Sequence, residues 1–374
     1  MTTPFIPLPR WIEIGLTPAI NIFMAFVVSG LVVAAIGANP WEAMKILIIG
    51  AFGNPESIGY TLYYTTNLIF TGLAVAVAFH AGLFNIGGEG QAYIGGLGIG
   101  MICLLLDKYL PAPLLIPLAI LVGAAFGAFW AFIPAWLQAY RGSHIVITTI
   151  MFNFIASAVM VYLLREWLIK PGQMSPESRT FEISAFVPYA HEVLAAIGIT
   201  VTPSPLNLSI IWALICCVLV GGLLWNTRWG YEIRAVGNNE TAAIYAGIDP
   251  KWVIVLAMAI SGALAGSLGV NEIMGVNHRL ILGFTAGYGF TGIAVALMGN
   301  NHPFGIVLAS LLFGALYQGG TELSFEIPKI TRDMVVVIQG LVILFSGALA
   351  FMVRPYVTRV YLALRRTPLI APAE

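Results

Sequence analysis

Apolar runs of about 20 residues recur along the whole chain, separated by short breaks rich in glycine, proline and polar residues. Each run is long enough to cross a bilayer as a helix, and no strand-like alternation accompanies them. Lipid forces the backbone polar groups of a spanning segment to bond within a helix. The pattern therefore predicts an all-α, polytopic membrane helical bundle of about ten spans, at residues 18–37, 61–83, 86–106, 113–137, 143–164, 208–226, 251–272, 283–299, 304–320 and 334–353.

The connection at residues 165–207 is the longest between two predicted spans, and it contains several prolines. Proline and glycine at this density predict a loop with short helical pieces. Five spans precede this loop and five follow it. We therefore expect one membrane domain over residues 1–374, with a first half at 1–164 and a second half at 208–374. A short helix at residues 41–52 is expected at the membrane interface.

Lysine and arginine indicate the orientation of a helical membrane protein, because cytoplasmic loops carry an excess of them. An even number of spans places both termini on one side, and the 17 lysines and arginines divide almost evenly between the two sides. A cluster directly after the last span favours a cytoplasmic position for both termini. This makes 165–207 extracytoplasmic and 228–250 cytoplasmic. The cluster comprises Arg354, Arg359, Arg365 and Arg366.

The composition supports a membrane protein, since 59% of the residues are hydrophobic and only 9% are charged. A soluble domain has about a quarter charged residues. The formal net charge of zero gives no basic face for nucleic acid. All three cysteines, Cys103, Cys216 and Cys217, fall within apolar runs, which predicts core residues and not disulfides or metal ligands. The first apolar run is longer than the core of a signal peptide, so we expect a retained span.

Two stretches of the chain echo each other. The sequence TGLAVAV at residues 71–77 is similar to TGIAVAL at residues 291–297, and each is followed by a polar break and another apolar run. Internal repeats are common in transporters, where the substrate path tends to lie between the copies. The span count makes these two copies parallel, and a count that differs by one span would make them inverted.

FNIGGEG, residues 84–90, is a polar break between two apolar runs. Asn85 is a good N-cap for the following helix, and Glu89 then falls in the first turn, where a negative charge meets the helix dipole. In a second interpretation, a broken helix with a costly intramembrane carboxylate faces a water-filled path. The residues alone leave both interpretations open.

Other polar residues within the predicted spans are few and mostly uncharged, and Glu272 stands at the end of one span. Each alone more often makes an interhelical hydrogen bond than it binds a ligand. As a set, they indicate a polar, weakly charged lining that suits a neutral, hydrogen-bonding solute. We predict that the substrate path is lined by Asn67, Asn85, Glu89, Gln91, Asn153 and Glu272.

Residues 227–251 form a long polar insertion on the predicted cytoplasmic side. Ala242, Ala243 and Ala246 predict a short helix of small residues, which Gly247 can end. This segment is either a solvated loop or a docking surface for a soluble partner.

Several catalytic motifs are absent from the sequence. There is no G-x-x-x-x-G-K-[ST] phosphate-binding loop, no H-E-x-x-H and no G-x-S-x-G. The five histidines are scattered. We therefore predict no catalytic residues, no metal site and no cofactor bound by this chain.

Four blocks of sequence carry a family resemblance. Residues 82–96, GLFNIGGEGQAYIGG, resemble the signature of permease subunits of bacterial ABC importers of the branched-chain amino acid and ribose type. Residues 229–248, WGYEIRAVGNNETAAIYAGI, resemble the coupling segment of the same family, and SGALAG at 261–266 and GYGFTGIAVALMGN at 287–300 follow in the family's order. The FNIGGEGQ form and the chain length are most similar to the nucleoside, or simple sugar, branch.

The resemblance implies a multi-pass permease in the bacterial inner membrane that imports nucleosides by ATP-driven alternating access. It implies a second permease subunit as a different chain, a cytoplasmic ABC ATPase that binds the ATP, and an extracytoplasmic substrate-binding lipoprotein. It also implies a coupling helix that docks on the ATPase, with its residues among Arg234, Gly237, Asn238, Asn239, Glu240, Ala242, Ala243 and Gly247.

Other functions stay open at this point. The same machine could carry a pentose, another simple sugar or a branched-chain amino acid, because a polar lining discriminates poorly among them. A stand-alone channel or secondary transporter would leave residues 227–251 without a role. An intramembrane enzyme lacks candidate acid, base and metal residues.

Overall fold

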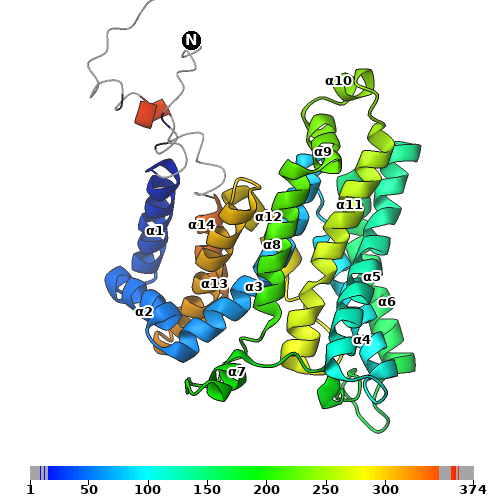
Figure 1. Ribbon diagram of the computed structural model, residues 1–374. Helices are drawn as coiled ribbons and strands as arrows, with labels where there is room; N and C mark the ends of the chain where they lie inside the picture. The colour runs from blue at the N-terminus through cyan, green and yellow to red at the C-terminus, as the bar shows by residue number, and fades with distance from the viewer. Residues whose placement is uncertain (1–8, 10–11, 13–15, 345–354, 359–360, 362–374) are drawn as a thin grey trace, which may run out of the picture. The chain divides into compact units, whose positions relative to one another are not determined.

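Helices dominate the computed structural model, which describes residues 9, 12, 16–344, 355–358 and 361 (Figure 1). Over these residues the chain forms two isolated β-bridges and no strand, which confirms the all-α prediction. The long and medium helices are α1 (Thr17–Ala35), α2 (Pro40–Phe52), α3 (Pro55–His80), α4 (Gly88–Leu106), α5 (Ala112–Arg141), α6 (Ile145–Leu163), α8 (Ser209–Asn226), α9 (Arg228–Asn238), α11 (Pro250–Gly266), α12 (Tyr288–Met298), α13 (Pro303–Glu326) and α14 (Arg332–Ile343). The short ones are η2 (Leu164–Leu168), η3 (Ile183–Ala185), α7 (Ala190–Ala196), α10 (Glu240–Tyr245) and η4 (Val270–Asn277).

Seven helical segments in the described chain are long and apolar enough to cross a membrane. Two shorter apolar helices, Phe23–Ala35 and Tyr288–Met298, coincide with two further predicted spans. The tenth predicted span begins in α14 and continues beyond the described residues, so the count of ten is not confirmed. The arginine cluster that decided the orientation also lies outside the described residues, and the orientation stays a prediction.

The chain divides into two units, one formed by Met1–Leu47 with Gly320–Glu374 and the other by Ile48–Gly319. In the first unit, α1 packs against α14, and apolar side chains such as Val33, Leu323 and Ile338 form its core. Every residue predicted to act in transport belongs to the second unit. The division into halves at 1–164 and 208–374 stays a prediction.

Within the second unit, α5 and α11 run antiparallel with their backbones in contact (Figure 1). A Cβ atom added to Gly127 would lie 2.2 Å from the carbonyl oxygen of Gly262, and one added to Gly262 would lie 2.2 Å from that of Gly127. Small residues permit this close approach of two membrane helices. The contact fixes α11, and η4 beyond it, against the rest of the unit.

The two echoing stretches pack against each other. A Cβ atom on Gly72 of α3 would lie 2.9 Å from the side chain of Val295, and one on Gly292 of α12 would lie 2.6 Å from the side chain of Thr71. At the last residue of α3, the ring Nε2 of His80 lies 3.1 Å from the backbone carbonyl oxygen of Asn301, which follows α12. The stretches therefore run side by side in the same direction, as the span count predicts.

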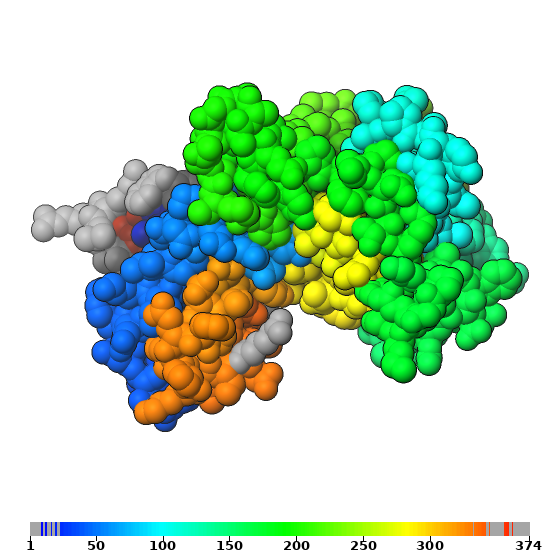
Figure 2. All heavy atoms as spheres, turned by 90° about the horizontal axis from the view of Figure 1, so that it is seen from below, coloured from blue at the N-terminus to red at the C-terminus, as the bar shows by residue number. Residues whose placement is uncertain are grey.

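Residues 165–207 form a loop with short helices, as predicted, and the structure shows what this loop contacts. The backbone N–H of Phe181 donates to the carbonyl oxygen of His278 at 2.8 Å, and that of Val187 donates to the carbonyl oxygen of Met274 at 3.1 Å. Figure 2 shows the yellow segment that contains η4 with the green surface of the loop beside it. The loop thus covers the end of the second unit at which η4 lies.

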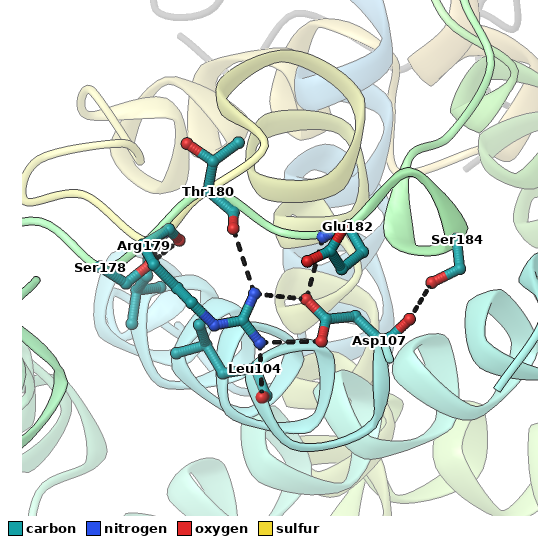
Figure 3. A network of polar contacts seen from close by, with 8 residues as sticks. Leu104, Asp107, Ser178, Arg179, Thr180, Glu182 and Ser184 are labelled. Atoms are coloured by element: carbon teal, nitrogen blue, oxygen red, sulfur yellow. Dashed lines mark hydrogen bonds and ion pairs between the residues drawn. The ribbon is translucent and has the colours of Figure 1, made fainter. Parts of the chain in front are cut away.

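An ion pair anchors this loop to the end of α4 (Figure 3). The guanidinium of Arg179 donates to both carboxylate oxygens of Asp107, at 2.7 and 2.8 Å, and the backbone N–H of Glu182 donates to one of them at 2.9 Å. Burial opposes the charge on Asp107, but these hydrogen bonds and the positive charge of Arg179 lower its pKa below the ordinary value. The Asp107 side chain is fully buried, so the pair fixes the loop in place.

We expect Arg179→Ala to lower the free energy of unfolding by about 1–3 kcal/mol, because it leaves a buried carboxylate short of donors. Thermal unfolding in detergent and protease cleavage within 165–207 measure the effect. Because the pKa of Asp107 is lowered, the pair's contribution is present at neutral pH and is lost as the pH falls below about 4. Arg228→Ala is the matched control, since it breaks an exposed pair with Glu232 and should change little. Equal stability of the two variants would contradict the anchoring role.

Candidate functional site

The FNIGGEG break lies between the end of α3 and the start of α4, and its asparagine is buried. Asn85 Oδ1 accepts from the backbone N–H of Gly87 at 2.8 Å, while its Nδ2 donates to Gln91 and to Ser261 Oγ, both at 2.9 Å. The N-cap of α4 is Gly87, which has no side chain. The prediction that Asn85 is the N-cap is wrong, because the helix starts two residues later and the amide shapes the preceding turn.

Glu89 lies in the first turn of α4, as predicted, but its carboxylate serves a different helix. Its two oxygens accept from the backbone N–H groups of Gly287 and Gly289, at 2.9 and 2.8 Å, at the start of α12. A Cβ atom on Gly289 would lie 2.2 Å from the backbone nitrogen of Glu89, so the two helix starts touch. The interpretation that Glu89 balances the N–H groups of its own helix is wrong, because the N–H groups that it binds belong to the start of α12. The carboxylate supplies the acceptors that α12 lacks at its glycine N-cap.

Asn153 of α6 holds the same break from the other side. Its Nδ2 donates to the carbonyl oxygen of Ile86 at 3.0 Å, and its Oδ1 accepts from the backbone N–H of Gly90 at 2.9 Å. Four of the predicted path residues, Asn85, Glu89, Gln91 and Asn153, thus gather around one irregular segment and satisfy backbone groups or each other. Their role in lining a path stays a prediction.

The other two predicted path residues meet at a second polar cluster. Glu272 of η4 is buried, and its Oε1 accepts from the hydroxyl of Tyr63 and from Nδ2 of Asn67, both at 2.5 Å. The described part of the chain places no lysine, arginine or histidine within ion-pair distance of this carboxylate. Neutral donors from α3 therefore hold a buried carboxylate, an arrangement typical of functional sites within membranes.

Asn271 connects this cluster to the end of the long loop. Its Nδ2 donates to Oδ1 of Asn67 at 2.8 Å, and its Oδ1 accepts from Nδ2 of Asn207 at 2.7 Å and from Oγ of Ser209 at 2.9 Å. The polar network thus runs from the start of α8 through η4 to α3. The π-helical geometry of η4 places adjacent polar residues into this network, and such geometry occurs frequently at functional sites.

Four tyrosines lie beside this network, and the sequence analysis did not identify them. Ring centroids lie 5.0 Å apart for Tyr63 and Tyr64, 5.5 Å for Tyr64 and Tyr317, and 5.9 Å for Tyr288 and Tyr317. Tyr288 is buried and the other three are half-buried. The signal for two of them was present, because Tyr63, Tyr64 and Asn67 fall at the spacing of one helix face. The tyrosines of α12 and α13 join them only through the fold.

The predicted coupling residues lie in α9, α10 and the turn that follows. Asn239 Oδ1 caps α10 by accepting from the backbone N–H of Ala242 at 3.0 Å, and Gly247 ends the segment with φ +80°. The predicted short helix of small residues is thus confirmed. Within α10, the side chain of Ala243 is buried, whereas that of Tyr245 is 89% exposed. Docking by this segment stays a prediction.

Comparison with known proteins adds a family. The family model described as branched-chain amino acid transport system / permease component matches residues 57–347. The chain is 33% identical over 368 residues to the glucose ABC transporter permease protein TsgB13 of Haloferax volcanii, covering 98% of this chain and 94% of that protein. It is 36% identical over 332 residues to the nucleoside ABC transporter permease protein NupB of Lactococcus lactis, covering 88% and 90%. It is 35% identical over 343 residues to the guanosine ABC transporter permease protein NupP of Bacillus subtilis, covering 90% and 94%.

Proposed function

The chain belongs to the family of branched-chain amino acid transport system permease components, and we propose that it imports nucleosides as the permease subunit of an ABC importer. The observation that carries the choice of cargo is the tyrosine group beside the Asn67–Glu272 pair. Tyrosine rings stack on a planar base, and a carboxylate with a neighbouring amide hydrogen-bonds sugar hydroxyls. Two relatives named for nucleoside or guanosine transport support this choice.

The proposed mechanism is alternating access driven by partner subunits. A cytoplasmic ABC ATPase binds ATP and docks on the coupling segment, which holds Asn238, Glu240 and Ala243. Its closure moves the helices of the permease, and the path opens to a loaded extracytoplasmic lipoprotein. ATP hydrolysis then resets the path. A second permease subunit, as a different chain, completes the transmembrane part. In this arrangement, both termini and residues 228–250 lie in the cytoplasm, and 165–207 lies outside.

A sugar is the second candidate cargo. The relative named for glucose transport matches nearly the whole chain, and the same hydrogen-bonding groups would bind sugar hydroxyls. A sugar lacks a planar aromatic ring, so it would stack less well on the tyrosine rings. Branched-chain amino acids, named in the family description, carry an ammonium and a carboxylate group on one carbon. Within the two polar clusters described above, the charged side chains are Glu89 and Glu272, which offer no partner for the carboxylate.

Uptake of labelled guanosine and uridine by cells that express the full gene cluster, with and without this chain, tests the proposal. We expect uptake to require the chain and to be competed by unlabelled nucleosides, but not by ribose, glucose or leucine. Competition by a sugar alone would keep the permease and change its cargo. An ATPase that co-purifies with the chain separates the importer from a stand-alone channel, which needs none.

A further inference from the structure

Gly237, in the last turn of α9, makes a backbone contact with the end of α3. A Cβ atom added to Gly237 would lie 2.1 Å from the carbonyl oxygen of His80 and 2.8 Å from the backbone nitrogen of Gly82. No side chain fits at these distances. Gly82 itself has φ +74°, the left-handed conformation that ends many helices. Both sides of this contact, which we call the α3–α9 joint, are therefore glycine for physical reasons.

The joint is rigidly connected to α10. Asn239 ends α9, where its backbone N–H donates to the carbonyl oxygen of Ala235 at 3.1 Å, and it also caps α10 through its side chain. α10 begins at the next residue, Glu240, so no flexible linker separates α10 from Gly237. A force applied to α10 therefore reaches the joint directly.

α9 is also attached to the end of α8, at a separate place. Arg234 Nε donates to the carbonyl oxygen of Leu224 at 3.0 Å, and a Cβ atom on Gly230 would lie 2.0 Å from the carbonyl oxygen of Leu223. These contacts hold α9 in the unit whether or not the α3–α9 joint is intact. A change at Gly237 should thus alter the connection to α3 without releasing α9.

The helix on the other side of the joint carries the candidate cargo site. Asn67 lies about 20 Å along α3 from His80, at a rise of about 1.5 Å per residue. His80 also contacts the backbone of Asn301, which follows α12, so two helices end at this place. A shift of the joint along or across α3 would move Tyr63 and Asn67 relative to Glu272, which belongs to η4.

We propose that Gly237 is a positioning residue for import, and that the α3–α9 joint passes the movement of the coupling segment to α3. The inference rests on the proposed function, because it takes α10 as the element on which the ATPase acts. Gly237 faces the end of α3, and α10 is the element on which the ATPase acts in this proposal. The proposed role of the joint is to make α3 move whenever the coupling segment moves.

Gly237→Ala tests the proposal in the purified complex with its ATPase, second permease and binding protein, reconstituted in vesicles. We measure guanosine uptake and ATP hydrolysis together. Uptake per ATP hydrolysed is expected to fall on the order of tenfold, as for other changes within coupled networks. The amount of co-purified ATPase should stay at the wild-type level, because the added methyl group meets the end of α3. Gly222→Ala is the matched control, since this helical glycine of α8 has open space around it and should leave the ratio unchanged.

Two further variants keep the test decisive. Gly82→Ala alters the other side of the joint and should also lower the uptake per ATP hydrolysed. It tests the role of the joint if Gly237→Ala fails to reach the membrane. Ala243→Trp places a large side chain at a buried position of α10, so it should displace this helix and lose the ATPase from the complex. An unchanged ratio in the joint variants would overturn the proposal, and so would loss of the ATPase from Gly237→Ala, because the contact would then serve docking. A wild-type complex that hydrolyses ATP without importing any nucleoside would contradict the proposed function instead.

Discussion

Glu272→Ala should reduce uptake by about tenfold or more while the protein still reaches the membrane. The change removes the acceptor shared by the Tyr63 hydroxyl and the Asn67 amide. Each stranded buried donor costs about 1–3 kcal/mol, and either group can recover this only by moving. Because both donors belong to α3 and the acceptor belongs to η4, the change removes two of the hydrogen bonds that hold together the two elements of the candidate cargo site, and only those of Asn271 remain. Uptake of labelled guanosine at equal membrane levels of the protein measures the effect.

Glu272→Gln distinguishes the hydrogen bonds from the charge. Its amide oxygen can accept from both Tyr63 and Asn67, so we expect most of the uptake to remain. Glu166→Ala is the surface control, because that carboxylate is exposed on η2 and should have no effect on uptake. Wild-type uptake by Glu272→Ala would remove Glu272 from the candidate site.

Glu89→Ala should impair transport more than membrane insertion. The substitution removes the acceptors of two backbone N–H groups at the start of α12, at a cost of about 1–3 kcal/mol for each. α12 carries Tyr288 next to these groups, so a loosened helix start disturbs the tyrosine group directly. Uptake, expression level and thermal unfolding of the same preparation provide the comparison.

Glu89→Gln should give an intermediate result, because one amide oxygen replaces two carboxylate oxygens and the negative charge near the helix start is lost. Thr331→Ala is a matched control for loss of a helix cap, since it removes the side-chain cap of α14, which belongs to the other unit of the chain. Full uptake by Glu89→Ala at normal expression would show that the cap of α12 is not needed for import.

The sequence pattern was sufficient to predict those structural features that depend on residues close together along the chain. The long apolar runs predicted the helices, because a lipid-facing backbone must bond within its own segment. The proline-rich stretch at 165–207 predicted a loop with short helices, and three alanines followed by Gly247 predicted α10. The FNIGGEG break was found for the same reason, since polar residues and glycines interrupt an apolar run there.

Partners across the fold could not be predicted in this way. Asn67 and Glu272 are both visible as polar residues within apolar spans, but nothing in either segment indicates that they form a hydrogen bond with each other. Glu89 was expected to interact with the N-terminus of its own helix, because the sequence gives no sign that α12 begins in contact with α4. Tyr317 joined the site only because α13 brings its ring near those of Tyr64 and Tyr288.

By itself, then, the sequence determined a helical membrane protein, the positions of its polar break and of the short helix α10, and a resemblance to importer permeases. These depend on hydrophobic period, turn residues and contiguous motifs, which are local. The tertiary structure alone decided which helix Glu89 caps, that Glu272 is held by α3, and that Gly237 touches the end of that helix. Such pairings depend on the packing of helices far apart in the chain, because a buried polar group takes whichever partner the packed fold brings within reach.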